Sequence, residues 1–383
     1  MQTLKYLNVR SDLLHKYTLL AGSTAFWRQA ERDMAAASKR LYVQAMTFEA
    51  DAAGAAVGAA VRRSDAVDRR VLVDQFTRFV ISDRFIWSLA YLTDRGFRAE
   101  VLATYAMFRG LKADGVGVRL TNPMGPLLSG FAFRNHKKLI VADDVAYIGG
   151  INFSDHNFAW GDLMLRIEGG KAPDRLAADF LDTYAGQSRG WTEDFGDLTL
   201  YGFDGRDNRA GFQEIIAEID RAAREVCLVS PYLTFPFVDA LARATARGVA
   251  VRLITPLKNN KPSVRDYLLR AAGAAGFDIR LTPEMIHLKG LLIDGRRLVL
   301  GSSNFDFVSY HAEEELVAVL DDEALIADFQ ALVIAPALAT ALPPGAYIPS
   351  GLAGRRGHAI LKAAEWVIRH SRYRRRTASD WTY

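Results

Sequence analysis

The sequence is poor in the features that build disulfide-bonded, zinc-binding or membrane-spanning proteins. Its 383 residues include a single cysteine, Cys227, which excludes an intramolecular disulfide and a cysteine-based zinc site. The longest apolar stretch, residues 324–342, is interrupted by Asp328, Gln330 and Pro336, and we expect a buried helix followed by a loop there. The N-terminus lacks the apolar core of a secretory signal. These absences predict a soluble or peripheral protein in a reducing compartment.

Positive charge is scarce outside the C-terminal segment. The chain carries +4, and the residues from Arg355 onward hold eight basic and two acidic residues, a net of +6, so the remainder is −2. Apolar residues recur in this tail with helical spacing, at Ile360, Leu361, Ala364, Val367 and Ile368. Such a basic amphipathic helix can lie on an anionic bilayer, or it can dock on the protein body with a solvated basic end. The sequence leaves both possibilities open.

Strands and helices alternate along the chain in an order that occurs twice. Buried strands are expected within residues 39–51, 69–76 and 115–123 of the first half, and within 224–235, 248–256 and 278–283 of the second. Helices are expected from about Ser23 and Gly211, and over 238–247 and 263–275. This alternation predicts an α/β fold, and its recurrence predicts an internal duplication.

Each half also contains the pattern His-x-Lys-x4-Asp. The two copies are His136, Lys138 and Asp143, and His287, Lys289 and Asp294. If each His-x-Lys lies on a strand, its two side chains point to the same face, whereas the aspartates fall at odd offsets. A glycine-containing turn and an asparagine follow each copy, at Gly149, Gly150 and Asn152, and at Gly301, Ser302 and Asn304.

This set of residue types suits phosphodiester chemistry. Lysines and small polar donors can neutralise the charge that builds on phosphate oxygens. One histidine can attack phosphorus and form a covalent intermediate, while a second protonates the leaving alcohol and deprotonates the incoming one. Two motifs that meet at one site would supply both histidines without a metal.

The two patterns resemble the HKD motifs of the phospholipase D superfamily over roughly residues 22–321. The second copy meets the full pattern His-x-Lys-x4-Asp-x6-Gly-Ser-x-Asn, and the first copy is one residue shorter before its glycines. The flanks are similar to bacterial cardiolipin synthases. Residues 160–170, WGDLMLRIEGG, match the family's Trp-x-Asp-x3-Arg-Ile-Glu-Gly segment, and Glu315 follows the second asparagine by 11 residues, as in the family.

The resemblance implies two similar phospholipase D-like domains, each a mixed sheet flanked by helices, related by a pseudo-twofold axis with the active site at their interface. The expected boundaries are an N-terminal extension over 1–20, a first domain over 21–185, a linker over 186–208, a second domain over 209–345 and a basic amphipathic tail over 346–383.

The resemblance also assigns roles to individual residues. It implies that His136 is the nucleophile and His287 the general acid and base, although the sequence itself is symmetric on this point. Asp143 and Asp294 belong to the catalytic motifs. The phosphate oxygens would be held by Lys138, Lys289, Asn152, Ser302 and Asn304. Asp162 and Glu315 would orient the histidines, with Glu313 and Glu314 as alternatives to Glu315. No metal or cofactor is implied.

The implied reaction converts two phosphatidylglycerol molecules to cardiolipin and glycerol, in a protein peripheral to the cytoplasmic face of the inner membrane and in contact with its anionic surface. Alternatives are a phospholipase D that uses water, a transferase with another acceptor, a nucleic-acid phosphodiesterase, and a catalytically silent membrane-binding protein. Nucleic acid is not expected as a partner, because the body is slightly acidic and shows no basic groove with stacking aromatics. The sequence leaves acyl-chain preference and oligomeric state open.

Overall fold

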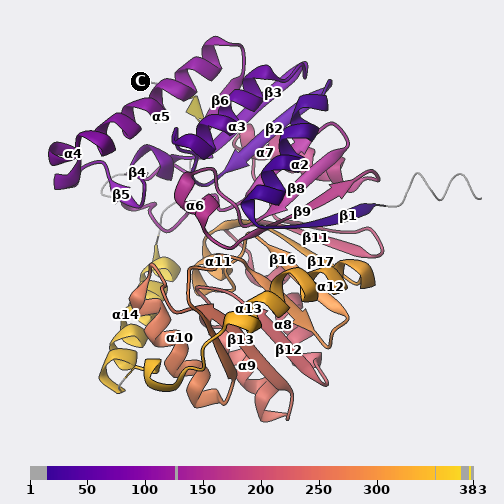
Figure 1. Ribbon diagram of the computed structural model, residues 1–383, viewed down its shortest axis with the longest axis vertical. Helices are drawn as coiled ribbons and strands as arrows, with labels where there is room; N and C mark the ends of the chain where they lie inside the picture. Colours follow the sequence, from indigo (N-terminus) through magenta and orange to yellow (C-terminus); the bar gives the residue numbers. More distant parts are fainter. Residues whose placement is uncertain (1–14, 126–127, 350, 372–378, 381–383) are drawn as a thin grey trace, which may run out of the picture. The chain divides into compact units, whose positions relative to one another are not determined.

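The computed structural model describes residues 15–125, 128–349, 351–371 and 379–380, and it divides into two compact units (Figure 1). The first holds the described residues to Ala159, Leu163–Arg189 and the strand Ser379–Asp380. The second holds Trp160–Asp162 and the described residues from Gly190 to Ser371. Residues 1–14 of the expected extension and the tail arginines 374–376 lie outside the described residues.

The first unit is built on a mixed sheet in the order β1-β9-β8-β7-β2-β3-β6-β18. Its strands are β1 (Lys16–Ala21), β2 (Arg40–Ala45), β3 (Asp68–Asp74), β6 (Gly117–Thr121), β7 (Leu139–Ala142), β8 (Val145–Gly149), β9 (Leu163–Glu168) and β18 (Ser379–Asp380). Strands β2, β3 and β6 are parallel, and the other pairings are antiparallel. A separate hairpin joins β4 (Val80–Ile81) to β5 (Arg84–Phe85).

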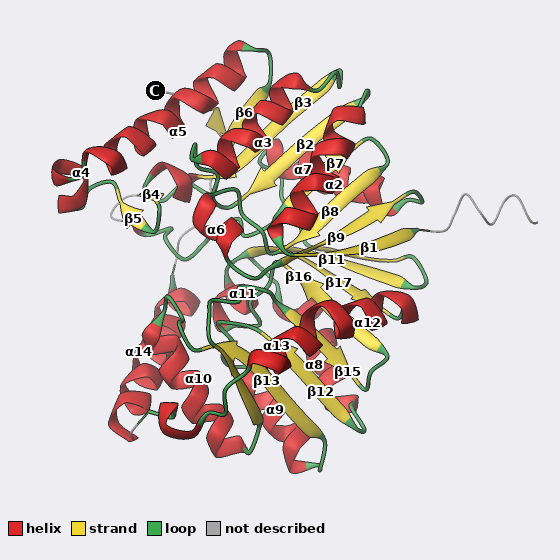
Figure 2. Ribbon diagram, viewed as in Figure 1, coloured by secondary structure: helices red, strands yellow, loops and turns green. Residues whose placement is uncertain are grey.

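Helices cover both faces of this sheet, as the alternation of side chains along β2 requires (Figure 2). The helical elements are α2 (Ser23–Ala36), α3 (Ala52–Arg63), η1 (Gln75–Arg78), α4 (Leu89–Thr93), α5 (Arg95–Ala113), α6 (Asp155–Ala159) and α7 (Ala172–Tyr184). Val43 packs into a core with Phe26 of α2 and Phe108 of α5. The next side chain back, Tyr42, points the other way and stacks on Phe180 of α7, with 4.8 Å between ring centroids. Each fully buried phenylalanine contributes about 1.5–3 kcal/mol to this packing.

The second unit repeats the plan with a sheet in the order β10-β11-β17-β16-β15-β12-β13-β14. Its strands are β10 (Trp191–Asp194), β11 (Leu198–Asp204), β12 (Glu225–Val229), β13 (Ala250–Pro256), β14 (Asp278–Thr282), β15 (Gly290–Ile293), β16 (Arg297–Gly301) and β17 (Glu314–Leu320). Its helical elements are α8 (Arg209–Arg221), α9 (Phe237–Ala246), α10 (Pro262–Ala275), α11 (Phe307–His311), α12 (Glu323–Phe329), η3 (Gln330–Ile334), α13 (Ala335–Thr340), η4 (Gly345–Tyr347) and α14 (Gly351–His370).

The order of strands demonstrates the duplication directly. The run β9-β8-β7-β2-β3-β6 in the first sheet corresponds to β17-β16-β15-β12-β13-β14 in the second, with the same parallel and antiparallel neighbours. The predicted α/β class with two mixed sheets is therefore confirmed. The units differ from the expected boundaries at four places. Strands β10 and β11 lie within the expected linker but belong to the second sheet, and α14 of the expected tail belongs to the second unit. Lys16–Ala21 pairs with β9 as an edge strand, and Trp160–Asp162 belongs to the second unit.

The apolar stretch near residue 330 is helical for longer than expected. Among the described residues, the helix over Glu323–Thr340 is long and apolar enough to cross a membrane. Core helices of soluble proteins also meet this criterion of length and composition. The sequence predicted that a loop follows a helix within this stretch, but the chain stays helical as far as Thr340. A π-helical turn precedes Pro336 and places that proline in the first turn of α13, where its missing N–H costs little. One face packs on the sheet: a Cβ on Gly290 would lie 2.6 Å from Cζ of Phe329.

Candidate active site

The second histidine motif forms a compact buried cluster with an aspartate from a distant part of the chain. His287 Nδ1 lies 2.8 Å from Asp162 Oδ2, and Lys289 Nζ lies 2.7 and 2.9 Å from the two ring nitrogens of His287. The Asp162 carboxylate is also 3.9 Å from Lys289 Nζ. All three residues are at most 5% exposed. The carboxylate thus fixes one ring nitrogen, as orienting carboxylates do for catalytic histidines.

The backbone explains how Asp162 reaches this histidine. Gly161 forms a parallel bridge with Ile286, and the Gly161 carbonyl accepts hydrogen bonds from the N–H groups of His287 and Leu288 at 2.6 and 3.1 Å. His287 and Lys289 lie in the extended segment just before β15, not on a strand as the sequence suggested. Their alternation is kept, because the segment is extended and pinned by residue 161.

Two aromatic rings and a further lysine surround His287. The ring centroids of Trp160 and Tyr232 lie 5.3 and 5.8 Å from that of His287. Lys261 Nζ stands 4.2 Å from the centre of the Tyr232 ring, in a cation–π contact. These rings limit the rotation of the imidazole, and Lys261 adds positive charge to the surroundings of the histidine.

Burial tunes the charge of the motif lysine. Desolvation lowers the pKa of Lys289 to about 8, although the carboxylates of Asp162 and Glu315 act in the opposite direction. A lysine of this kind remains protonated at neutral pH yet lacks the hydration that would weaken its pull on an anion. An anionic ligand beside it would therefore bind strongly.

The residues after β16 add hydrogen-bonding groups to the second motif. Asn304 is 5% exposed, and its Oδ1 has no hydrogen-bond partner among the described residues. Ser302 Oγ donates to one oxygen of the fully buried Glu315, and Ser309 Oγ donates to the other at 2.7 Å. The Glu315 carboxylate is thus fixed by two hydroxyl groups within its own unit. An unpaired buried amide oxygen is costly unless something binds it, so Asn304 is a suitable ligand-binding group.

The first motif stands in an equivalent place before β7 in the first unit. His136 is 5% exposed, Lys138 is fully buried, and Lys138 Nζ donates to the carbonyl of His136 at 2.6 Å. The amide of Asn152 accepts from the N–H of Thr47 at 3.3 Å and donates to Asn157 at 3.4 Å. The histidine, lysine and asparagine therefore occupy positions in this unit that match those of the second motif.

Polar neighbours that the sequence did not reveal hold the first motif in place. Asp74 pairs with Arg134 at 2.7 Å and accepts the N–H of Asn135, whose side chain in turn accepts from Gln44 at 2.9 Å. Lys137 is fully buried and donates to both oxygens of Asp179 at 2.8 Å. These partners come from the end of β3 and from α7, so they could not be read from one sequence.

Asp143 and Asp294, expected as parts of the catalytic motifs, accept backbone N–H groups of neighbouring segments. Each lies in the hairpin turn at the far end of β7 or β15 from its histidine, with φ near +50°. Asp143 accepts the N–H groups of residues 38–40 at 2.9 Å, and Asp294 accepts those of residues 223–225 at 2.8–3.2 Å. Burial alone would raise both pKa values, but these N–H groups lower them below the ordinary range. The two aspartates fix the starts of β2 and β12.

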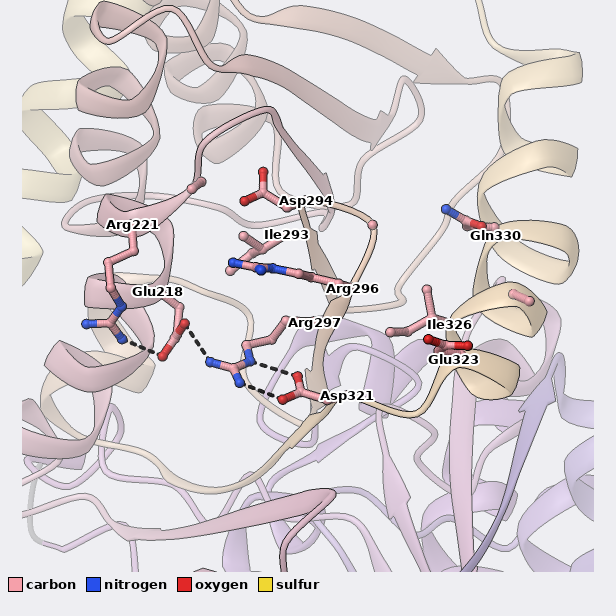
Figure 3. A pocket seen from close by; sticks show the side chains of 13 residues that line it. Glu218, Arg221, Ile293, Asp294, Arg296, Arg297, Asp321, Glu323, Ile326 and Gln330 are labelled. Carbon is pink, nitrogen blue, oxygen red and sulfur yellow. Dashed lines mark hydrogen bonds and ion pairs between the residues drawn. The ribbon is translucent and has the colours of Figure 1, made fainter.

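A pocket of about 610 Å³ opens beside Asp294, at that same turn end of β15 and β16 (Figure 3). Its Arg297 pairs with Glu218 at 2.8 Å and with Asp321 at 2.5 Å, and its Arg221 pairs with Glu218 (Figure 3). Because these arginines are already neutralised and the pocket lies at the far end of β15 from His287, it is not part of the candidate active site.

Comparisons with known proteins agree with this reading of the motifs. Residues 215–333 match the family described as cardiolipin synthase, phospholipase D-like domain. Minor cardiolipin synthase ClsB of Bacillus subtilis (strain 168) is 30% identical over 249 residues, which cover 58% of this chain and 61% of that protein. Cardiolipin synthase B of Escherichia coli (strain K12) is 29% identical over 297 residues, which cover 63% of this chain and 70% of that protein.

The fold has a solved counterpart as well. The crystal structure of phosphatidylserine synthase from Haemophilus influenzae Rd KW20 matches with a TM-score of 0.70 and 15% sequence identity, over 96% of this chain and 99% of that one. At this identity the likeness concerns the fold alone. The family match over residues 215–333 and the sequence relatives, together with the duplicated motifs, support a place for this chain in the phospholipase D superfamily, beside cardiolipin synthases.

Proposed function

We propose that this protein is a phosphatidyltransferase of the phospholipase D type, and that it makes cardiolipin and glycerol from two phosphatidylglycerol molecules. The observation that carries the proposal is the buried His287–Asp162 pair with Lys289 beside it, together with a second His–Lys copy in the duplicated unit. The cardiolipin synthases among its relatives support the choice of phosphatidyl transfer over other phosphodiester reactions.

In the first half of the proposed reaction, a ring nitrogen of neutral His136 attacks the phosphorus of phosphatidylglycerol. A P–N bond forms as the P–O bond to the head-group glycerol breaks, and protonated His287 gives its proton to the departing glycerol oxygen. The hydrogen bond between Asp162 and Nδ1 of His287 leaves Nε2 as the nitrogen that exchanges this proton. The products of this step are free glycerol, a phosphatidyl-histidine and neutral His287.

In the second half, the head-group hydroxyl of another phosphatidylglycerol attacks the same phosphorus. Its proton passes to His287, a P–O bond forms, and the P–N bond to His136 breaks. Lys138, Lys289, Asn152 and Asn304, with Ser302, hold the phosphate oxygens in this scheme. Both histidines end in their starting protonation states, so the cycle balances as two phosphatidylglycerols in, and one cardiolipin and one glycerol out.

Exposed apolar side chains in the first unit fit a lipid substrate. Trp87, Leu89 and Leu92, on and beside α4, are 61%, 73% and 69% exposed, and Phe131, five residues before His136, is 42% exposed. A cluster of this kind is unusual on a monomeric soluble protein and is typical of surfaces that meet apolar partners. We propose that these side chains contact acyl chains, and that the protein acts as a peripheral protein at a membrane.

The experiment is lipid mass spectrometry after purified protein is incubated with phosphatidylglycerol vesicles. Wild type should make cardiolipin and glycerol in equal amounts, and His136→Ala and His287→Ala should make neither above background. His15→Gln, a change in a half-buried histidine outside both motifs, serves as the matched control and should keep full activity. Phosphatidic acid as sole product would show that water is the acceptor, and the absence of any product would overturn the proposal.

A further inference from the structure

Helix α14 docks on the second unit through one narrow face. Leu361 and Ile368 are 7% and 9% exposed, and a Cβ on Gly357 would lie 2.8 Å from the carbonyl oxygen of Ser263 at the start of α10. The sequence grouped Ile360 and Val367 with these residues on a single apolar face. In the structure Ile360 and Val367 point outward, so the helix has two apolar faces, of which one is docked.

The outward face of α14 is strongly apolar for a surface helix. Leu352, Ile360, Trp366 and Val367 are 72%, 56%, 63% and 59% exposed. Their spacing of eight, six and one residues places them along one side of the helix. This side, together with the basic residues beside it, is called here the α14 outer face.

A crevice of about 280 Å³ lies between α10 and α14. Three of its lining residues are Tyr267, Ala271 and Ala274, and the other three are Arg270, Arg355 and His358. The lining contains no acidic residue. Within the described part of the chain, neither Arg270 nor Arg355 makes an ion pair. The crevice therefore joins an apolar interior to two cationic groups without counter-charges.

The charge of the helix itself has the same sign. Residues 351–371 carry four basic residues, Arg355, Arg356, Lys362 and Arg369, and one acidic residue, Glu365, a net of +3. Glu365 is already paired with Lys362 at 3.1 Å and with His311 at 3.3 Å. Three arginines of this helix therefore remain for an external anion.

We propose that the α14 outer face and the adjoining crevice form a docking site for an anionic phospholipid bilayer. A lipid phosphate would be held by Arg270 and Arg355, with acyl carbon against Tyr267 and Ala271, while Ile360, Trp366 and Val367 enter the interfacial region. The inference rests on the proposed function for its choice of a phospholipid as partner. The residues of this surface belong to neither histidine motif, and the surface adds a membrane contact that the reaction chemistry does not require.

The pairing of charge with apolar exposure favours a bilayer over a nucleic acid. A nucleic acid would pair favourably with the arginines but would leave Ile360 and Val367 exposed to water. A bilayer interacts favourably with both the basic and the apolar side chains, because anionic lipids attract basic residues and tryptophan is suited to the interface between head groups and acyl chains. Exposed aliphatic side chains on a basic helix are typical of helices that lie in a membrane interface.

The test is flotation of the full-length protein with phosphatidylcholine vesicles, with and without phosphatidylglycerol. Wild type should bind the phosphatidylglycerol vesicles, and each of Arg270→Gln and Arg355→Gln should lower the partition coefficient about fivefold, as loss of one basic residue near an anionic surface does. Arg296→Gln, an equal charge change at an exposed arginine on the β15–β16 turn, should bind like wild type.

The apolar part is tested by a second matched pair. Ile360→Ser should weaken binding, whereas Leu102→Ser, at a leucine of the first unit with the same 56% exposure, should not. Vesicles with brominated acyl chains should quench tryptophan fluorescence less in a Trp87→Phe/Trp366→Phe double variant than in Trp87→Phe alone, the difference being the contribution of Trp366. Equal binding by wild type, Arg270→Gln and Ile360→Ser would overturn the proposal, as would binding to duplex DNA but not to vesicles.

Turnover separates this inference from the proposed function. On monomeric short-chain phosphatidylglycerol, Arg355→Gln and Ile360→Ser should react at the wild-type rate, because no docking is needed. On vesicles the same variants should be slower in proportion to their lost binding. Vesicle binding without any turnover would support the docking site and contradict the proposed function. Turnover by variants whose vesicle binding is unchanged would support the proposed function and contradict the docking site.

Discussion

The assignment of Asp294 to strand fixation predicts that its replacement loosens β12. In Asp294→Ala the N–H groups of Ala223, Arg224 and Glu225 lose their carboxylate acceptor. Asp294 also has φ +52°, a conformation that asparagine tolerates better than alanine. Asp294→Asn keeps a carbonyl oxygen and should therefore be the milder change.

The magnitude follows from the three donors. Hydrogen bonds to a charged group contribute about 1.5–3 kcal/mol each, and those three N–H groups belong to exposed residues that water can reach, so about 3 kcal/mol is expected for their joint loss. The positive φ adds about 1 kcal/mol for alanine. The total is about 4 kcal/mol for Asp294→Ala, and about 1–2 kcal/mol for Asp294→Asn, which loses mainly the charge.

The single cysteine of the chain provides the assay. Cys227 lies in β12, two residues beyond the segment that Asp294 holds, and is 9% exposed. Burial raises its pKa to about 12, so a thiol reagent labels it only when β12 opens. Since about 1.4 kcal/mol is a factor of ten, the loss of about 4 kcal/mol in Asp294→Ala raises the native-state labelling rate about 700-fold.

The first unit supplies the control. Asp143→Ala removes the equivalent contacts at the start of β2 and should leave the labelling of Cys227 close to wild type. Both variants should keep phosphatidyl transfer under conditions where they are folded. Loss of activity in Asp294→Ala with unchanged labelling of Cys227 would refute the structural role and return Asp294 to the chemistry.

Three further predictions follow from the buried charges. Because the pKa of Lys289 is lowered to about 8, its positive charge is lost above that pH, so kcat/KM on short-chain phosphatidylglycerol should fall as pH rises through 8. In Lys289→Arg this fall at high pH should disappear, because arginine stays charged. Asp162→Asn should lower kcat about 100-fold with little change in KM, since it removes the orienting carboxylate of His287; an unchanged kcat would contradict that role. Asp179→Ala should destabilise the first unit by about 3–5 kcal/mol in urea unfolding by leaving Lys137 buried without its partner, and Lys137→Met in addition should restore most of the loss.

The sequence was sufficient for the features that depend on local pattern. Buried strands such as β2 and β12 contain short apolar runs, and the recurrence of their order identified the duplication that the two sheets display. The end of the helix near Pro336 was misplaced because a π-helical turn accommodates that proline, and one sequence does not show such a turn. The turn follows directly on Phe329, whose ring packs on Gly290, and this tertiary contact is not visible in local propensity.

The side-chain partners of the motif depended on tertiary structure. The resemblance named Asp162 as an orienting acid, but its attachment to the second unit follows from the Gly161–Ile286 bridge, which joins segments 125 residues apart. Lys261 was missed, although its place soon after β13, one of three parallel strands, was an available signal. The odd offset of Asp294 from His287 did indicate that their side chains do not share one face. In the structure Asp294 lies in the hairpin turn after β15.

The most direct test of the proposed reaction is to trap its covalent intermediate. His287→Ala is mixed with phosphatidylglycerol vesicles, quenched under alkaline conditions that preserve phosphohistidine, digested and analysed by mass spectrometry. The account predicts a phosphatidyl adduct on His136, absent from His136→Ala, with release of one glycerol per adduct. An adduct on another residue, or cardiolipin formation by wild type without any adduct on His136 at any time of quenching, would contradict it.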